Sequence, residues 1–221
     1  MLRRLSTAIA ATAIIATAAA ADAPSSQTAS FNVGGVAYTM PLPAGYCLPT
    51  GQLIAIAQTV AAADSANVTN LTLYRCDATP AKIGDYALVK TPANLISMTV
   101  DHATFAAQIA PEFDKPMPVS SDEISANVAD NYDKVIGKRP TIGIKLATRG
   151  HDAVCGYMTG GGTVGNGTIT KDIAMGACTT AIGGRVIQVI CFTESKLPAD
   201  QDRMMRQAKA LATTIVATGG K

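Results

Sequence analysis

Tryptophan is absent from this chain of 221 residues, which contains only four phenylalanines and six tyrosines. An excess of one charge is also lacking, since eighteen basic residues face sixteen acidic ones. Proteins that bind nucleic acid combine a basic surface with aromatic side chains that stack on bases, and adsorption to anionic membranes uses clustered Lys and Arg. The composition therefore disfavours nucleic acid and a lipid surface as partners.

The motifs of common reactive sites are missing as well. No two of the five cysteines have the Cys-x-x-Cys spacing of a redox enzyme, and no serine lies in a Gly-x-Ser-x-Gly elbow. The two histidines, His102 and His151, have no second histidine at the spacing of a zinc site. The sequence therefore predicts no metal and no cofactor.

A glycine-rich segment at 160–165 matches the G-x-G-x-x-G pattern of dinucleotide sites. Such a site needs a strand before the glycines and a helix after them, so that the phosphates meet the helix N-terminus. Here Asn166-Gly167 and the β-favouring residues 168–170 follow, which indicates a hairpin. We interpret the match as coincidental and expect this segment to form a mobile hairpin tip.

The first 21 residues have the pattern of a secretory signal peptide. Residues 3–4 are basic, residues 5–20 are uncharged and rich in Ala and Ile, and Ala19-Ala20-Ala21 provides the small residues of a cleavage site. The apolar run is shorter and weaker than the roughly 20 residues of a membrane span. Cleavage before Asp22 removes two basic residues and leaves sixteen of each sign, so the exported chain is formally neutral. We expect a periplasmic or secreted protein with no stable membrane insertion after signal cleavage.

About 200 residues remain after cleavage, which is enough for one domain that buries roughly 70% of its unfolded surface. Residues 22–30 are small and polar and predict a flexible tether, so that a single domain spans 31–217. A strand is expected near 33–40, with Gly34-Gly35 as its turn. Short β-rich segments follow at 71–76 and 86–90.

Three helices are expected in this first half, because apolar residues recur at the helical period. The first spans 52–63, and the second begins after Asp101 and ends before Pro111. The third opens with a capping box of Ser120 and Glu123 and ends at Gly137. We expect its inner face to carry Ile124, Val128, Tyr132 and either Val135 or Ile136.

From residue 141 the hydrophobic period changes from helical to alternating. We expect four antiparallel strands, beginning at 141 and followed by 152–160, 168–181 and 185–193, with two-residue turns at 166–167 and 183–184. A helix after Pro198 closes the chain, with Met204, Ala208, Leu211 and Ile215 on its inner face. The predicted fold class is α+β: an antiparallel sheet, including this C-terminal four-strand meander, packed against helices in a single domain.

The two ends of the chain resemble the PsbP-like family of small exported α/β/α-sandwich proteins. The shared features are an early strand that runs into Leu42-Pro43-x-Gly45-Tyr46 and a late strand over 185–193 that leads into the terminal helix. The resemblance implies a fold and an accessory or binding role. It implies no functional residue.

The expected turns set the neighbours of three cysteines. A two-residue turn at 166–167 places Cys155 directly opposite Cys178, within disulfide range, and the next turn places Cys191 on the same face. Cys155–Cys178 is therefore the favoured bond, worth about 3 kcal/mol by loop closure. Cys47 and Cys76 form a second, weaker candidate pair, which leaves Cys191 as a possible free thiol. Other pairings, and reduced cysteines in the core, remain alternatives.

Two functions of different class fit these observations. Export, a disulfide framework, neutrality and the lack of a reactive constellation favour a non-catalytic accessory or binding domain for an envelope protein or a small ligand. The alternative is a periplasmic enzyme whose site assembles from residues distant in sequence, with His151, Asp152, Tyr157 and Cys191 as candidate participants. A cleft that holds His151 beside a carboxylate and a hydroxyl would favour the enzyme, whereas a groove without such a cluster favours binding.

Overall fold

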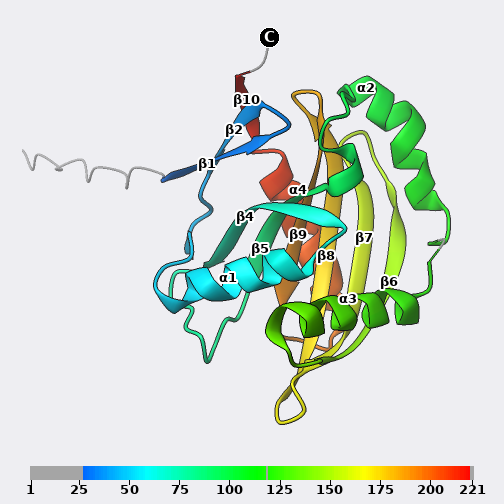
Figure 1. Cartoon of the computed structure of the whole chain (residues 1–221). Coiled ribbons are helices and arrows are strands. Elements are labelled where there is room, and N and C mark those ends of the chain that lie inside the picture. The colour runs from blue at the N-terminus through cyan, green and yellow to red at the C-terminus, as the bar shows by residue number, and fades with distance from the viewer. Residues whose placement is uncertain (1–26, 118, 220–221) are drawn as a thin grey trace, which may run out of the picture.

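The computed structural model describes residues 27–117 and 119–219 (Figure 1). The expected signal peptide at 1–21 and residues 22–26 of the expected tether lie outside the described residues. Residues 28–30, which we assigned to the tether, are instead part of the first strand. They pair with residues 39–41 across a hairpin, and Ala29 is buried, so the folded domain begins earlier than predicted.

The described elements include both helices and strands, and the predicted α+β class with a single domain is confirmed. In chain order they are β1 (Thr28–Val33), β2 (Val36–Pro41), β3 (Tyr46–Cys47), α1 (Gln52–Ala63), β4 (Asn67–Arg75), β5 (Tyr86–Pro92), α2 (His102–Thr104), α3 (Ser121–Ile136), β6 (Thr141–His151), β7 (Gly156–Gly165), β8 (Thr170–Ile182), β9 (Arg185–Thr193), α4 (Pro198–Ala212) and β10 (Val216–Gly219). Within the two described ranges, no helix combines the length and apolar character needed to cross a membrane.

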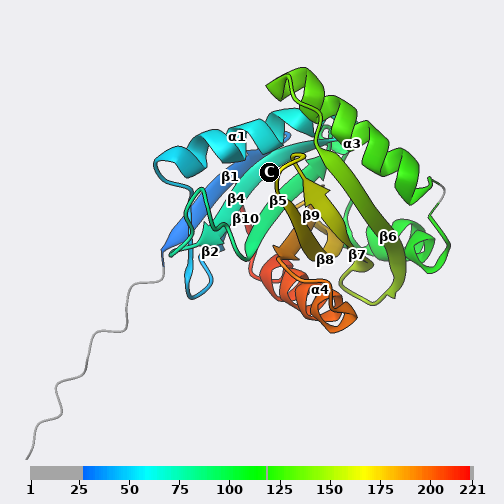
Figure 2. The ribbon, with the colours of Figure 1, turned by 90° about the horizontal axis from the view of Figure 1, so that it is seen from below.

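The strands form two antiparallel sheets. The larger sheet has the order β3-β4-β5-β9-β8-β7-β6, so the predicted meander of β6 to β9 is continued by β5, β4 and β3. The smaller sheet has the order β1-β2-β10. Figure 2 shows α4 on one side of the larger sheet and α1 and α3 on the other. Helices therefore lie on both sides of this sheet.

The main core lies between α4 and the larger sheet. Met204, Ala208 and Leu211 of α4 pack on Val189 and Cys191 of β9 and on neighbouring strands. The helix approaches β8 very closely at Gly176. A Cβ atom added at this residue would lie 2.0 Å from the backbone nitrogen of Met205. A side chain at this position would separate the helix from the sheet.

The register of the meander agrees with the prediction at one hairpin and differs at the other. Gly183-Gly184 joins β8 to β9, and Cys178 faces Val189 as expected. The β7–β8 connection contains four residues, 166–169, because the last pair of the ladder is Gly165 with Thr170. Tyr157, not Cys155, is therefore opposite Cys178, and the predicted register was wrong by two residues.

Helix α3 has the predicted ends, and its inner face agrees with the prediction only in part. The Ser120 hydroxyl accepts a hydrogen bond from the Glu123 backbone N–H, and Gly137 adopts a left-handed conformation after the last turn. The fully buried positions are Ser125 and Ala129, whereas Val135 and Ile136 are exposed. The predicted positions Ile124, Val128 and Tyr132 are half-buried, because the helix also turns its serines toward the edge of β6.

Two serine hydroxyls of α3 bind the outer backbone edge of β6. Ser125 Oγ accepts from the Ile144 N–H at 3.1 Å and donates to the Ile144 carbonyl at 3.2 Å. Ser121 Oγ does the same with Leu146, at 2.9 and 3.5 Å. Each hydroxyl thus takes the place of a neighbouring strand along the last strand of the sheet, which would otherwise expose unpaired backbone groups.

Three further expectations about local structure were wrong. The helix after Asp101 does not stop before Pro111. It continues as a π-helical segment over Phe105–Ile109 and a 3₁₀-helical segment over Ala110–Asp114, because proline is tolerated at the first position of a helical turn. Ile215 lies beyond the end of α4, in the turn that leads to the unpredicted strand β10. Residues 160–165 lie within β7, not at a hairpin tip.

Candidate functional site

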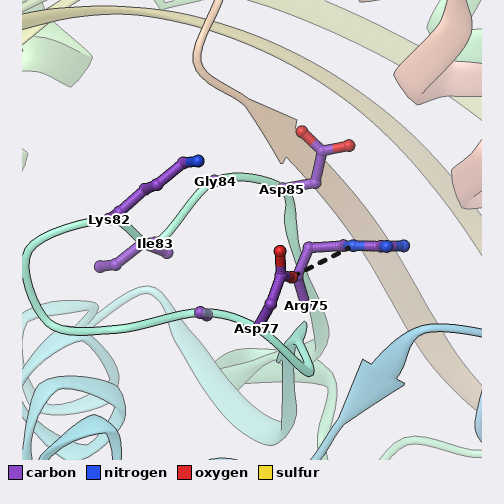
Figure 3. A pocket seen from close by; sticks show the side chains of 7 residues that line it. Arg75, Asp77, Lys82, Ile83, Gly84 and Asp85 are labelled. Atoms are coloured by element: carbon purple, nitrogen blue, oxygen red, sulfur yellow. Dashed lines mark ion pairs between the residues drawn. The ribbon is translucent and has the colours of Figure 1, made fainter.

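A pocket of about 190 Å³ lies at the end of the larger sheet, where β4 and β5 are joined by residues 76–85 (Figure 3). The pocket is partly open to solvent and combines charged, small and apolar side chains. It is lined by Arg75, Asp77, Ala78, Lys82, Ile83, Gly84 and Asp85. We refer to it as the β4–β5 pocket.

Covalent and hydrogen bonds fix the segment that surrounds this pocket. A disulfide joins Cys76, directly after β4, to Cys47 of β3, with the two Cα atoms 5.0 Å apart. Thr79 and Lys82 exchange backbone hydrogen bonds of 3.0 and 2.9 Å, which closes a tight turn at the tip. Gly84 then adopts a positive φ of 65° that favours glycine before β5 begins. The pocket wall is thus held by bonds at its start and its tip.

Arg75 is one of the two cations that line the pocket. Its guanidinium lies over the ring of Tyr46, 5.4 Å from the centroid, in a cation–π arrangement. Its nearest carboxylate is that of Asp77, with Nε and Oδ1 3.9 Å apart, which is too long for a hydrogen bond. None of the hydrogen bonds found within the described ranges uses its side-chain N–H donors, and the side chain is 43% exposed.

The ring beneath Arg75 is itself fixed. Tyr46 is buried, and burial raises the pKa of its phenol, which remains neutral. Its oxygen accepts a hydrogen bond of 2.6 Å from the side-chain amide of Gln207 on α4. The aromatic platform under the guanidinium is therefore joined to the C-terminal helix.

Asp85, which neighbours Arg75 across β4 and β5 and accepts a hydrogen bond from its backbone N–H at 3.3 Å, already has protein partners for its side chain. Its Oδ1 accepts a hydrogen bond of 2.6 Å from the Thr193 hydroxyl at the end of β9. Its Oδ2 lies 3.5 Å from the guanidinium of Arg203, which also binds Asp200 on α4. This carboxylate fixes the pocket to α4 and β9 and leaves Asp77 as the less engaged of the two pocket carboxylates.

Two of the candidates named from the sequence, Asp152 and Tyr157, meet in a separate cluster. The Tyr157 hydroxyl donates to Asp152 Oδ2 at 2.6 Å, and Lys209 of α4 donates to the same oxygen at 2.6 Å. The backbone N–H groups of Val154 and Cys155 bind Oδ1 at 2.8 and 2.9 Å. Lys209 was not identified from the sequence, since it is far from Asp152 along the chain.

The ionisation of this cluster follows from these contacts. Partial burial acts to raise the pKa of Asp152, but the hydrogen bonds from Lys209, Tyr157 and the two backbone groups outweigh it and lower the pKa. Burial, and then the hydrogen bond to Asp152, raises the pKa of Tyr157 to about 12. The hydrogen bond to Asp152 raises the pKa of Lys209. At neutral pH the carboxylate accepts, and the phenol and ammonium donate, so the cluster has neither a free base nor a free acid.

The remaining candidates lie apart from this cluster. His151 faces Asp114, with Nδ1 and Oδ1 3.0 Å apart, and belongs to a different set of contacts from Asp152. Cys191 is a buried free thiol in the core beneath α4. Burial raises its pKa to about 12, so the thiol stays protonated and is a poor nucleophile. The structure therefore brings only Asp152 and Tyr157 together.

Cys155 and Cys178 form the second disulfide, with the two Cα atoms 5.3 Å apart, despite the altered register. Cys155 precedes β7 in a turn closed by a hydrogen bond from Asp152 N–H to the Cys155 carbonyl. This turn brings Cys155 diagonally across to Cys178. Both pairs named from the sequence are thus present, and Cys191 is the free cysteine.

Metal and dinucleotide sites find no support in the described part of the chain. No group of three or more His, Cys, Asp or Glu side chains there could hold a metal ion. The glycines at 160–162 lie in β7, where added Cβ atoms would clash with Leu146, Gln201 and the backbone of Gly143. These glycines allow close packing within the sheet.

The β4–β5 pocket was not predicted from the sequence. One usable signal was the Arg75-Cys76-Asp77 tripeptide, which places a cation and an anion on either side of a cysteine in a candidate disulfide. Such a cysteine fixes the backbone that carries both charges. The contribution of Tyr46 depends on tertiary packing and left no signal of this kind.

Comparisons with known proteins give a fold-level result. No protein-family model matches the chain, and no curated protein matches it. Among solved structures, the chain is similar to the solution structure of cyanobacterial PsbP (CyanoP) from Synechocystis sp. PCC 6803, with 9% sequence identity and a TM-score of 0.38. The alignment covers 91% of this chain and 98% of that chain. The weak, fold-level resemblance expected from the sequence is therefore present.

Proposed function

We propose that the protein is an exported, non-catalytic binding domain that holds a small polar ligand in the β4–β5 pocket. The observation that carries this proposal is the environment of Arg75, which is one of the pocket-lining residues and whose guanidinium rests on Tyr46. None of the hydrogen bonds found within the described ranges uses its guanidinium donors. A guanidinium held by an aromatic ring can bind a planar acceptor such as a carboxylate with little loss of entropy. Ligand sites commonly combine a concave surface with a few such groups.

Export is supported by the signal-peptide pattern of residues 1–21 and by the two disulfides, which persist in oxidising compartments. Expression with an intact N-terminus tests this part. We expect protein recovered from the periplasm or medium to have the intact mass of a chain that begins at Asp22. A membrane-bound product that retains residues 1–21 would contradict both cleavage and export.

A binding role is favoured over catalysis by the state of the candidate reactive groups. Asp152, Tyr157 and Lys209 are bonded to one another, and Cys191 is buried and protonated. Catalytic acids and bases need an open partner and a pKa near the working pH. The pKa values of Asp152 and Tyr157 are shifted away from neutrality, in opposite directions.

Calorimetry with the exported protein tests the pocket. We would titrate a panel of small carboxylates, phosphates, amines and amino acids into the wild type, the Arg75→Ala variant and the Arg149→Ala variant. Arg149 pairs with Asp202 on a different part of the surface and serves as the matched control. We expect at least one compound to bind, with an affinity lowered about tenfold or more by Arg75→Ala and unchanged by Arg149→Ala.

Two outcomes would overturn the proposal. Binding that survives Arg75→Ala would place the ligand elsewhere. If no compound of the panel binds, the proposal of a small-molecule ligand is excluded. In the latter case, an envelope protein captured by the wild type but not by Arg75→Ala would assign the pocket to a protein partner.

A further inference from the structure

The charges that line the β4–β5 pocket differ in how far they are already paired. Asp85 is bound by Thr193 and Arg203. Asp77 is 82% exposed, and within the described ranges its one ion-pair contact is the 3.9 Å approach to Arg75. Lys82 takes part in none of the ion pairs found in the described part of the chain. The groups that remain for a ligand are therefore two cations, Arg75 and Lys82, and one anion, Asp77.

The arrangement of these three groups disfavours a simple ion as ligand. A plain anion at Arg75 would lie beside the carboxylate of Asp77, and a plain cation at Asp77 would lie beside the guanidinium. Like charges placed this close at a binding surface oppose association. A ligand with a carboxylate and an ammonium group on the same carbon atom avoids both repulsions, because each of its charges meets an opposite one.

The distance between Arg75 and Asp77 suits such a ligand. At 3.9 Å the two side chains attract each other without forming a hydrogen bond, so both retain their full capacity for new ones. Guanidinium binds carboxylate through two parallel hydrogen bonds, and carboxylate binds ammonium through charge-assisted ones. Tyr46 keeps the guanidinium in place while these hydrogen bonds to the ligand form.

The rest of the lining fits a small side chain. Ala78 and Ile83 provide an apolar wall, and the volume of the pocket is about 190 Å³. Figure 3 shows Lys82 across the pocket from Asp77 and Arg75. Its ammonium group is the second pocket cation, and it forms no ion pair within the described ranges.

Resting on the proposed function above, we infer that the ligand is a free α-amino acid. Arg75 binds its α-carboxylate, Asp77 binds its α-ammonium group, and Ala78 and Ile83 contact the first atoms of its side chain. Lys82 selects side chains that end in a carboxylate, because two free cations and one free anion match a ligand with two carboxylates and one ammonium.

The test uses calorimetry on the exported protein with four probes that separate the charges. Glutamate has all three groups, alanine lacks the second carboxylate, succinate lacks the ammonium and cadaverine lacks both carboxylates. We expect glutamate to bind tightest, alanine more weakly, and succinate and cadaverine at least tenfold more weakly than glutamate.

Two isosteric or truncating variants assign the contacts. Asp77→Asn is expected to lower the affinity for glutamate and for alanine about tenfold or more. The affinity for succinate should be unchanged or higher. Lys82→Ala is expected to lower the affinity for glutamate but not the affinity for alanine. Asp122→Asn, an exposed carboxylate on α3, is the control and is expected to change neither.

The failure of this inference is distinguishable from failure of the proposed function. If succinate binds as tightly as glutamate, and Asp77→Asn changes neither, the pocket binds anions and not amino acids, while the binding function stands. If cadaverine binds and succinate does not, the pocket is a cation site. If none of the four probes binds but another compound binds in an Arg75-dependent manner, the amino-acid ligand is wrong and the pocket remains the site.

Discussion

The ammonium group of Lys209 lies 2.6 Å from Oδ2 of Asp152, and this ion pair joins the C-terminal helix α4 to the turn between β6 and β7. Tyr157 binds the same carboxylate oxygen from β7. Helix α4 and the segment from Asp152 to Tyr157, which are distant in the sequence, therefore meet at one carboxylate. The contact holds α4 against the sheet beside the Cys155–Cys178 disulfide.

Replacement of Asp152 by Asn is expected to lower stability and to change its pH dependence. Because the pKa of Asp152 in the folded state lies below its ordinary value, its stabilising effect is fully present above about pH 4 and is lost as the pH falls further. The side chain is 38% exposed, and solvent screening limits the effect to about 1 kcal/mol, or roughly 2–4 °C in Tm. Thermal melts at pH 7 and pH 3 measure this.

The control for this variant is Asp202→Asn, which removes a surface ion pair with Arg149. We expect its Tm at pH 7 to change by less than that of Asp152→Asn, since exposed pairs contribute little. Equal losses in the two variants, or a loss for Asp152→Asn that is as large at pH 3 as at pH 7, would contradict the assignment.

Gly176→Ala is expected to destabilise the docking of α4. The new Cβ would lie 2.0 Å from the backbone nitrogen of Met205, and a backbone atom cannot move aside as a flexible side chain can. Overpacking of this kind costs about 1–3 kcal/mol. Gly143→Ala on β6 is the matched control, because its Cβ meets only the Thr163 hydroxyl at 3.4 Å. A denaturation midpoint for Gly176→Ala equal to that of Gly143→Ala would refute the close approach.

The local sequence correctly predicted those helix ends and turns that are determined by a few neighbouring residues. The Ser120 and Glu123 capping box and Gly137 determine both ends of α3. Gly183 and Gly184, with positive φ values of 55° and 81°, allow the two-residue turn that fixes the β8–β9 register. In each case the conformation is decided by backbone geometry that the sequence itself specifies.

The β7–β8 connection shows where such reasoning fails. The Asn166 side chain accepts hydrogen bonds from the backbone N–H groups of Thr168 and Ile169, at 3.1 and 3.0 Å, and stabilises a four-residue loop. An Asn-Gly pair is compatible with either loop length. The resulting shift of two residues keeps every side chain on its expected face, so Cys155 remains close to Cys178.

The candidate sites were only partly predictable, because they depend on docking between distant elements. Asp152 and Tyr157 are close in sequence and could be named together, but Lys209 reaches them only when α4 packs on the sheet. The same packing places Gln207 on Tyr46 beneath Arg75. Sequence patterns describe single elements well and contacts between them poorly.

The two serines of α3 are expected to protect the edge of β6. In a Ser121→Ala/Ser125→Ala variant, the backbone N–H and carbonyl groups of Ile144 and Leu146 lose their partners, and unmet backbone groups cost about 1–3 kcal/mol. We expect faster amide exchange at these two residues and more self-association, since an open edge can pair with a second chain. Hydrogen exchange and light scattering measure both.

Asn127→Ala on the exposed side of the same helix is the control for this pair. It should leave exchange at Ile144 and Leu146 unchanged, because Asn127 has no part in the contacts with β6. Slow exchange in the double variant would contradict the prediction, because it would show that the serine hydroxyls are not what protects this edge.

The Cys155–Cys178 disulfide is expected to contribute about 3 kcal/mol, because it shortens the loop available to the unfolded chain. Replacement of both cysteines by serine should lower the Tm by about 6–12 °C in a domain of this size. Peptide mapping without reduction identifies the partners directly. If either cysteine is joined to a different partner, or both are free in exported protein, the disulfide framework is wrong.

Cys191 is expected to be unreactive in the folded protein even though it is the free thiol. Its side chain is 0% exposed and burial raises its pKa to about 12, so both access and thiolate formation require opening of the core beneath α4. Labelling by a thiol reagent in native buffer should be slower than in denaturant by a factor of at least about 10³, which corresponds to a domain of ordinary stability. The Cys191→Ala variant supplies the background rate. Fast labelling under native conditions would show that the thiol is accessible, and Cys191 would then regain its place among the candidates for a reactive site.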